Sequence, residues 1–218
     1  MDPDSHPITP ERQRLRVRFS KQGDLRWISH RDLARTMERM IRRAGLVLRM
    51  SEGFHPKPKL AFPSALAVGI ASEAEVMELE LACPADPGEV ATRLNAQAPP
   101  GLTVRHVQAV PAGQSKARVR AMTYQFPVPG ERRPQVEQAM AQLLARTTLC
   151  IQRDDRAAPV DMRADLESLV WRDDGVRFRI AASQRASLRP RDVLAALGLA
   201  DLEQQGCFLT RSEVELTS

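Results

Sequence analysis

The sequence predicts an α+β protein made of two consecutive units, each with the element order β-α-β-β-α-β. Segments of alternating polar and apolar residues are typical of half-buried strands, and segments with apolar residues three and four positions apart are typical of helices. The 218 residues suffice for two domains of about 100 residues each. Since 43% of the residues are hydrophobic and only 4% aromatic, aliphatic side chains must fill both cores.

The first unit begins with a strand and a helix. Residues 14–20 alternate basic and apolar, which predicts a half-buried strand. A helix is expected over residues 30–44, with Ser29 as its N-cap and Asp32 completing a variant of the capping box. Gly45 is expected to end it as a C-cap. The apolar face of this helix consists of Leu33, Met37, Met40, Ile41 and Ala44.

The rest of the first unit alternates strands with one more helix. Two prolines and a glycine predict a loop over residues 51–59. The other expected elements are a strand at 46–49, an extended segment at 60–69, a strand at 75–81, a helix at 87–96 and a strand at 102–110.

The same order then recurs, although no sequence identity between the halves is visible. We expect a strand at 123–128, a helix at 132–146, strands at 148–153 and 160–170, a strand at 176–181 that forms a hairpin around residues 173–175, a helix at 189–198 and a strand at 205–216. Two tandem ferredoxin-like units with antiparallel sheets follow from this order. The predicted organisation is a disordered tail (1–11), a first unit (12–110), a linker (111–121) and a second unit (122–218).

Positive charge is concentrated near the N-terminus. Residues 12–59 contain 14 Lys or Arg against 4 acidic residues, whereas the chain from residue 60 onward contains 18 against 20. A concentrated basic surface favours a polyanionic partner, with nucleic acid as the first candidate. The alternative is a solvated helix surface that only increases solubility.

The candidate anion-binding residues lie around the first helix and the loop after it. The N–H groups at the N-terminus of that helix can bind a phosphate. Phe54 can stack on a base, or instead fill the core beneath the loop. We expect the arginines of the first strand and first helix to lie on one exposed side with the loop. The predicted RNA-binding or anion-binding residues are Lys21, Arg26, Ser29, His30, Arg35, Arg39, Arg42, Arg43, Phe54, His55 and Lys57.

The sequence predicts neither a metal ion nor a cofactor. Cys83, Cys150 and Cys207 are far apart, so no zinc or cluster spacing is present, and buried reduced thiols are expected. No apolar run approaches the roughly 18 residues of a membrane span, and no secretory signal is recognisable, so we expect a cytoplasmic protein. His30 and His55 remain candidates for a general acid/base pair.

Five segments resemble one known family. RVRFSKQG (16–23), WISHRDL (27–33), RRAGL (42–46), SEGFHPKP (51–58) and ALAVG (65–69) are similar to the radical-SAM-linked protein family, DUF2344. The resemblance implies an accessory module for a cobalamin-binding radical-SAM protein. Because this chain has no cluster-binding cysteine motif, the radical chemistry would belong to a separate protein. The chain departs from the family at Arg31, where many members have Leu, and at His55 and Lys57, where Asn and His are frequent.

These observations leave three functional hypotheses. The first is a non-enzymatic RNA-binding or substrate-presenting module that delivers tRNA or rRNA to a radical-SAM RNA-modifying protein. The second is a metal-independent endoribonuclease of the repeat-processing type that uses His30 or His55. The third is a protein-only adaptor whose basic surface docks on an acidic patch of the radical-SAM protein. No membrane partner is expected, and the sequence does not specify an oligomeric state.

Overall fold

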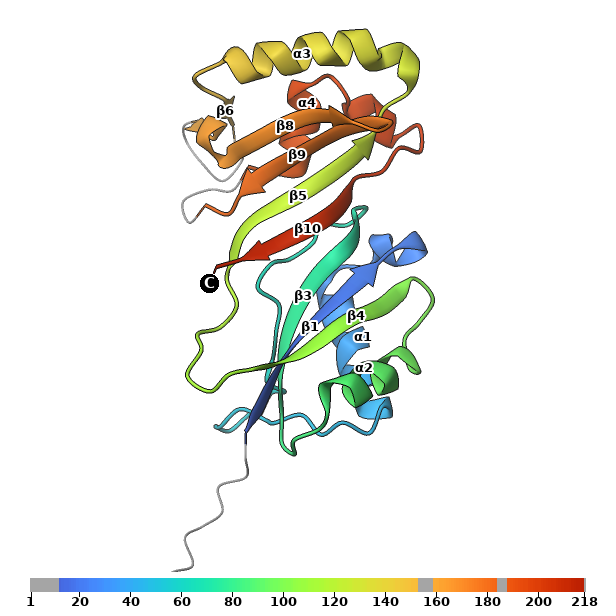
Figure 1. Ribbon diagram of the computed structural model, residues 1–218, viewed down its shortest axis with the longest axis vertical. Helices are drawn as coiled ribbons and strands as arrows, with labels where there is room; N and C mark the ends of the chain where they lie inside the picture. The colour runs from blue at the N-terminus through green and yellow to red at the C-terminus, as the bar shows by residue number, and fades with distance from the viewer. Residues whose placement is uncertain (1–11, 153–158, 184–187, 218) are drawn as a thin grey trace, which may run out of the picture. The chain divides into compact units, whose positions relative to one another are not determined.

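The computed structural model describes residues 12–152, 159–183 and 188–217, which form a mixed α/β fold (Figure 1). Within these residues there are four α-helices and a large, mostly antiparallel sheet. The chain divides into two units. Unit 1 contains the chain up to Ala67 together with Glu75–Ala117, and unit 2 contains Val68–Ala74 and the chain from Arg118 onward. The predicted tail 1–11 and the last residue of the strand predicted at 148–153 lie outside the described residues.

Unit 1 has one helix between its first two strands and one before its last. β4 pairs with β1, β1 with β3, and the short β2 with the other edge of β3. Both the β1–β4 and the β2–β3 pairings are antiparallel. The elements are β1 (Gln13–Lys21), α1 (His30–Arg43), β2 (Leu60–Ala61), β3 (Ala71–Leu81), α2 (Pro87–Asn95) and β4 (Leu102–Val110).

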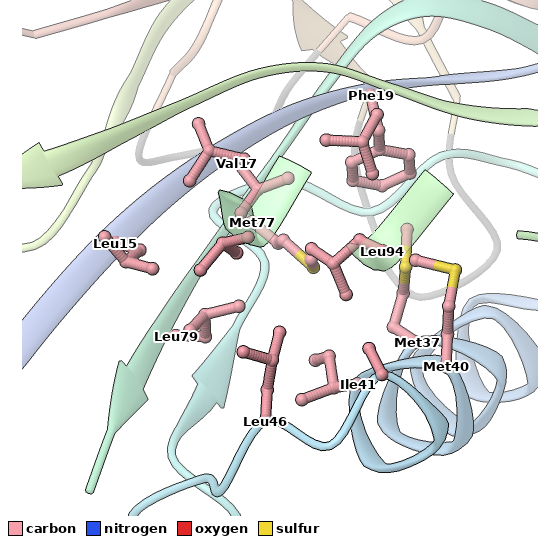
Figure 2. Close-up of a cluster of buried hydrophobic side chains, with 14 of the residues drawn as sticks. Leu15, Val17, Phe19, Met37, Met40, Ile41, Leu46, Met77, Leu79 and Leu94 are labelled. Carbon is pink, nitrogen blue, oxygen red and sulfur yellow. The ribbon is translucent and has the colours of Figure 1, made fainter. Parts of the chain in front are cut away.

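The core of unit 1 lies between the sheet and its helices. Leu15, Val17 and Phe19 of β1 are fully buried in the same cluster as the apolar face of α1 (Figure 2). All five residues predicted for that face are at most 8% exposed. Because successive side chains of a strand point to opposite sides, the arginines of β1 project from the sheet face that α1 does not cover.

Both ends of α1 follow the sequence prediction. The Ser29 hydroxyl accepts a hydrogen bond from the Asp32 amide at 3.2 Å and donates one to the Asp32 carboxylate at 2.6 Å. At the other end Gly45 adopts a φ of 67°, in the left-handed region that glycine enters without a Cβ clash. The Leu46 amide then donates to the Ile41 carbonyl at 3.1 Å, which closes the helix with a Schellman motif.

The chain between α1 and β3 differs from the prediction. Residues 46–49 form no strand: Leu48 makes a single bridge to Leu81, and Met50 makes one to Pro58. The extended segment expected at 60–69 is reduced to the two residues of β2. Proline lacks an amide hydrogen, so Pro58 cannot continue a ladder of hydrogen bonds at this position. β3 in turn begins at Ala71, four residues earlier than predicted.

Unit 2 has a comparable sheet. β10 pairs with β5, β5 with β9, and β9 with β8, all antiparallel. The first residues of β3, which belong to this unit, pair in parallel with β10. The elements are β5 (Val119–Pro127), α3 (Arg133–Ala145), β6 (Cys150–Ile151), β7 (Val160–Asp161), β8 (Leu166–Arg172), β9 (Gly175–Ala181), α4 (Pro190–Ala196) and β10 (Thr210–Leu216).

The strand predicted at 160–170 is interrupted by a turn. The carboxylate of Asp161 accepts hydrogen bonds from the Leu149 amide at 2.7 Å and the Arg163 amide at 3.0 Å. These two hydrogen bonds hold the pKa of Asp161 below its ordinary value. The chain then makes a 3-10 turn at Arg163–Asp165 before β8 begins. The last strand also starts later than predicted, at Thr210 instead of residue 205.

Two further predictions need correction. Cys83 and Cys150 are exposed and Cys207 is partly exposed, because they lie in a turn, on the two-residue strand β6 and in a loop, so the expected burial of the thiols is wrong. Residues 111–117, predicted as part of a linker, lie within unit 1. There the guanidinium of Arg14 donates to the carbonyls of Gln114 and Ser115.

Candidate nucleic-acid interface

The arginines of α1 are exposed along the helix. Arg35 lies 3.7 Å from the Asp32 carboxylate, with both side chains 55% exposed, so this ion pair contributes little. Among the described residues, no carboxylate lies within ion-pair distance of Arg39, Arg42 or Arg43. These three side chains belong to the last two turns of α1 and leave the C-terminal end of the helix strongly cationic.

A groove of about 430 Å³ opens beside those turns. We call its apolar lining the groove floor; this lining includes Val47, which is 62% exposed, and Met50, which is 44% exposed. Its charged lining residues, which we call its rim, are Arg39, Arg42 and a single carboxylate, Glu38. We call this feature the α1 groove; it is lined by Glu38, Arg39, Ile41, Arg42, Gly45, Leu46, Val47, Leu48, Met50 and Pro58.

The proline-containing loop is fastened to the segment that forms the groove floor. The Ser51 amide donates to the Lys57 carbonyl at 2.8 Å, and the Lys57 amide donates to the Ser51 hydroxyl at 2.9 Å. Phe54 is 102% exposed, so it does not fill the core, and that alternative is wrong. His55 and Lys57 are exposed as well. The loop therefore presents an aromatic ring and a cation from a closed turn.

The N-terminal end of α1 is less suited to bind a phosphate than the sequence indicated. The Asp32 carboxylate already accepts from the Ser29 hydroxyl in the first turn, so an incoming anion would meet a negative charge. Arg26 donates to the Gly23 carbonyl at 3.0 Å and lies over the Trp27 ring at 4.8 Å. His30 is exposed and contacts the edge of Phe62, with ring centroids 5.1 Å apart.

The residues of β1 do not share the surface of α1, so the expectation of one common side is wrong. Lys21 is 1% exposed, and its ammonium group lies 3.3 Å from the Ile28 carbonyl. Arg16 lies on the sheet face that α1 does not cover and forms an ion pair with Glu78 at 2.8 Å. The alternation of β1 causes this separation, because the apolar residues take the side that faces the helix.

The two candidate catalytic histidines are not brought together. His30 is the first residue of α1, whereas the loop of His55 is hydrogen-bonded to residues beyond the C-terminal end. A helix of 14 residues is about 21 Å long. Figure 1 shows the chain after α1, in light blue, leading away from the C-terminal end of the helix. This arrangement offers no histidine pair for acid/base catalysis.

Two other kinds of site are absent from the part of the chain that the structure describes. It contains no group of three or more His, Cys, Asp or Glu side chains placed to hold a metal ion. None of its helices has the length and apolar character needed to cross a bilayer.

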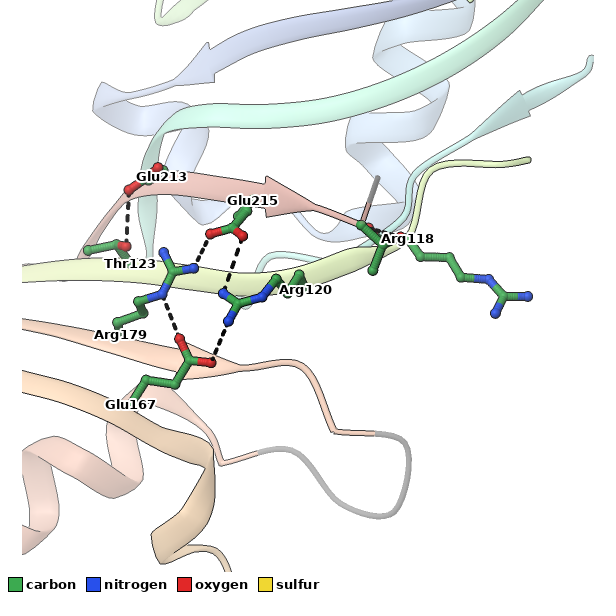
Figure 3. A network of polar contacts seen from close by, with 8 residues as sticks. Arg118, Arg120, Thr123, Glu167, Arg179, Glu213 and Glu215 are labelled. Atoms are coloured by element: carbon green, nitrogen blue, oxygen red, sulfur yellow. Dashed lines mark hydrogen bonds and ion pairs between the residues drawn. The ribbon is translucent and has the colours of Figure 1, made fainter. Parts of the chain in front are cut away.

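Unit 2 also carries arginines on its sheet, and two of them, Arg120 and Arg179, are neutralised by carboxylates (Figure 3). Arg179 donates to Glu167 at 2.6 Å and also to Glu215. Arg120 forms ion pairs with the same two carboxylates, at 3.5 Å and 3.2 Å. The hydrogen bonds to Glu167 and Glu215 raise the pKa of Arg179, and the bond from Arg179 lowers the pKa of Glu215.

The sequence pattern does not reveal the groove floor. It predicts a strand over residues 46–49, in which half of the side chains would be buried. The available signal was the helix-ending Gly45 followed by a short apolar run and then by prolines, a combination that limits the run to a short extended segment.

Comparisons with known proteins identify the family of the chain. Two solved structures are similar at low identity: an unknown protein from Galdieria sulphuraria (11% identity, TM-score 0.33, covering 95% of this chain and 100% of that one) and the acetolactate synthase small subunit from Thermotoga maritima (10% identity, TM-score 0.24, covering 95% and 96%). No curated protein matches the chain. A family model described as "Uncharacterized protein conserved in bacteria (DUF2344)" matches residues 14–190. The chain therefore belongs to the DUF2344 family.

Proposed function

We propose that the protein is an accessory RNA-binding or substrate-presenting module that works with a radical-SAM RNA-modifying protein. The observation that carries the proposal is the combination of three unneutralised arginines on α1 with the exposed Phe54 of the adjoining loop. Guanidinium groups bind phosphates, and an exposed aromatic ring can stack on a base. The radical-SAM partner is taken from the resemblance of the N-terminal segments to the radical-SAM-linked proteins.

The charges define how binding should respond to salt. Arg39, Arg42, Arg43 and Lys57 can each replace a counterion on an RNA phosphate. Four such contacts with a single strand give a slope of about −3 for the logarithm of the association constant against the logarithm of salt concentration. A binding surface built from paired arginines would release fewer counterions and give a flatter slope.

We further infer that each unit is a ferredoxin-like unit. The strand order β4-β1-β3-β2 in unit 1 and the order β10-β5-β9-β8 in unit 2 support this inference. In both units a helix follows the first strand and another precedes the last. A sheet of this kind leaves one face open while its helices offer an exposed outer surface, and the proposed RNA surface is on the outer side of α1.

The test is RNA binding by the purified full chain, measured by fluorescence anisotropy with a labelled RNA over a series of salt concentrations. The triple variant Arg39→Glu, Arg42→Glu, Arg43→Glu should lose about 100-fold in affinity and show a flatter salt slope. The matched control reverses three other exposed arginines, at Arg105, Arg118 and Arg146. An equal loss in both variants, or binding that is independent of salt, would contradict the proposal.

The α1 groove favours the adaptor as a second candidate. An apolar floor with two arginines on its rim also suits an acidic, amphipathic segment of a protein partner. Co-purification with the radical-SAM protein that survives nuclease treatment, and that Val47→Asp abolishes, would support this candidate. Loss of the complex on nuclease treatment would support RNA as the link.

A further inference from the structure

We infer that the α1 groove and Phe54 select an unpaired RNA segment over a duplex. The inference rests on the proposed function and specifies its substrate class. It depends on the apolar part of the surface, which phosphate binding alone does not require.

The apolar side chains indicate a ligand that offers the faces of its bases. Phe54, Val47 and Met50 are 102%, 62% and 44% exposed, so a ligand that covers their apolar surface would gain binding energy from it. An A-form duplex presents phosphates and 2′-hydroxyl groups, with its bases stacked inside. An unpaired segment can place a base on the Phe54 ring or in the groove.

The charges are arranged for the same ligand. Arg39 and Arg42 stand on the rim of the groove and can hold the phosphates on either side of an inserted base. Lys57 offers a third contact from the loop that carries Phe54. Glu38 is the one carboxylate among the lining residues, so removing its charge should strengthen binding.

The size of the groove favours bases over a peptide helix. A helix docks through side chains spread over two or more turns, which requires a long groove. At about 430 Å³, the α1 groove lies near the lower end of the range of small-molecule sites. A ring that is completely exposed on a loop is also placed to stack on a flat ligand instead of inserting into a partner.

The experiment compares two labelled RNAs with equal numbers of phosphates, an unstructured single strand and a hairpin duplex, by anisotropy at low and physiological salt. The single strand should bind at least about 10-fold more tightly. Phe54→Ala should weaken single-strand binding by about 5- to 100-fold and duplex binding by less than 2-fold, because base stacking is lost only with the former. Phe54→Trp should retain the preference, and Glu38→Gln should tighten both complexes.

The matched control is Val170→Ala, which removes another exposed apolar side chain, in unit 2, and should change neither affinity. Equal affinity for the two RNAs, with the triple arginine variant still defective, would overturn this inference and leave the proposed function standing. Absence of binding to either RNA would overturn both. A short poly-glutamate peptide can be tested as a competitor. If it displaces the single strand, and if Phe54→Ala lowers the affinity for the peptide as much as the affinity for RNA, the groove binds an acidic protein segment and the inference is overturned.

Discussion

The outer surface of α1 and the sheet of unit 2 are both rich in arginine, yet they differ in what surrounds the guanidinium groups. On the sheet of unit 2, Arg120 and Arg179 each contact two glutamates (Figure 3). On α1, Arg39, Arg42 and Arg43 have no carboxylate partner among the described residues. The same residue type therefore has two roles, stabilising the fold in one unit and remaining available to a ligand in the other.

This difference shows that a count of basic residues does not locate an anion-binding surface. Of the 14 basic residues in the region 12–59, Arg16 is neutralised by Glu78, and Arg49 and Lys59 by Glu80. Each of these carboxylates comes from β3, outside the basic region. The cations without an ion-pair partner among the described residues include Arg39, Arg42 and Arg43 on α1 and Lys57 on the loop.

The largest effect on the free energy of unfolding is expected at the buried ion pair between Arg16 and Glu78. Glu78 accepts hydrogen bonds from Arg16 at 2.8 Å and from the Ala117 amide at 3.2 Å, and it is 5% exposed. Glu78→Ala should reduce the free energy of unfolding by about 3 kcal/mol, because it leaves the Arg16 charge buried without its partner. Urea denaturation measures this. The double variant Arg16→Met, Glu78→Leu should recover most of the loss; a loss below about 1 kcal/mol for Glu78→Ala would show that the pair is not structural.

A smaller effect is expected in the network of unit 2. Arg179→Met removes hydrogen bonds to Glu167 and Glu215 at a partly exposed site, so it should cost about 1 kcal/mol at pH 7. Arg179 holds the pKa of Glu215 below its ordinary 4.5, so the stabilisation is complete above that pH and is lost as the pH falls below 4.5 toward the lowered value. Thermal denaturation from pH 7 to pH 3 should therefore show wild type and variant converging in acid. Parallel curves would contradict this assignment.

A variant at the N-cap of α1 should change the stability of the protein without changing its affinity for RNA. Ser29→Ala should cost about 1 kcal/mol, since the Asp32 amide loses its acceptor, while Ser29→Asp should keep the cap. RNA affinity should fall by less than 2-fold, because the proposed contacts lie at the other end of the helix. A 10-fold loss of affinity in a folded Ser29→Ala protein would place the N-terminal end of α1 in the binding surface.

The smallest effect on stability is expected for the unpaired arginines themselves. Arg39→Ala, Arg42→Ala and Arg43→Ala together should change the free energy of unfolding by no more than about 0.5 kcal/mol, because no ion pair is lost and alanine favours the helix. Urea denaturation of the triple variant and of Arg179→Met under the same conditions compares the two surfaces directly. If the triple variant lost more free energy of unfolding than Arg179→Met, the arginines of α1 would contribute more to stability than the paired arginine of unit 2, contrary to this assignment.

Local signals predicted much of unit 1 correctly. The alternation of β1, the apolar face of α1, the Ser29 cap and the Gly45 terminator each depend on residues within a few positions, and all four are confirmed. The prediction was wrong where the chain makes only isolated bridges, at 46–50, and where a side chain takes over backbone hydrogen bonds, at Asp161. Neither circumstance has a periodicity that a sequence pattern can display.

The candidate site was predicted in part. The helix and loop patterns correctly indicated exposed side chains at Arg39, Arg42, Arg43 and Lys57. Phe54 is also exposed, which agrees with the alternative that it stacks on a base and not with the alternative that it fills the core. Lys21 is buried because it lies on the same side of β1 as Leu15, Val17 and Phe19, and there its ammonium group lies 3.3 Å from the Ile28 carbonyl. The predicted strand ends at residue 20, whereas β1 extends to Lys21, so the prediction did not place this side chain on the buried side.

By itself the sequence determined the helices, most of the strands and the apolar face of each, because those properties depend on neighbouring residues. Only the tertiary structure decided which cations are paired with a carboxylate and which can still bind an anionic ligand. Arg16 and Glu78 are 62 residues apart along the chain and 2.8 Å apart in space. Electrostatic energy depends on the distance between charges and on their burial, and a fold sets both by bringing distant strands together.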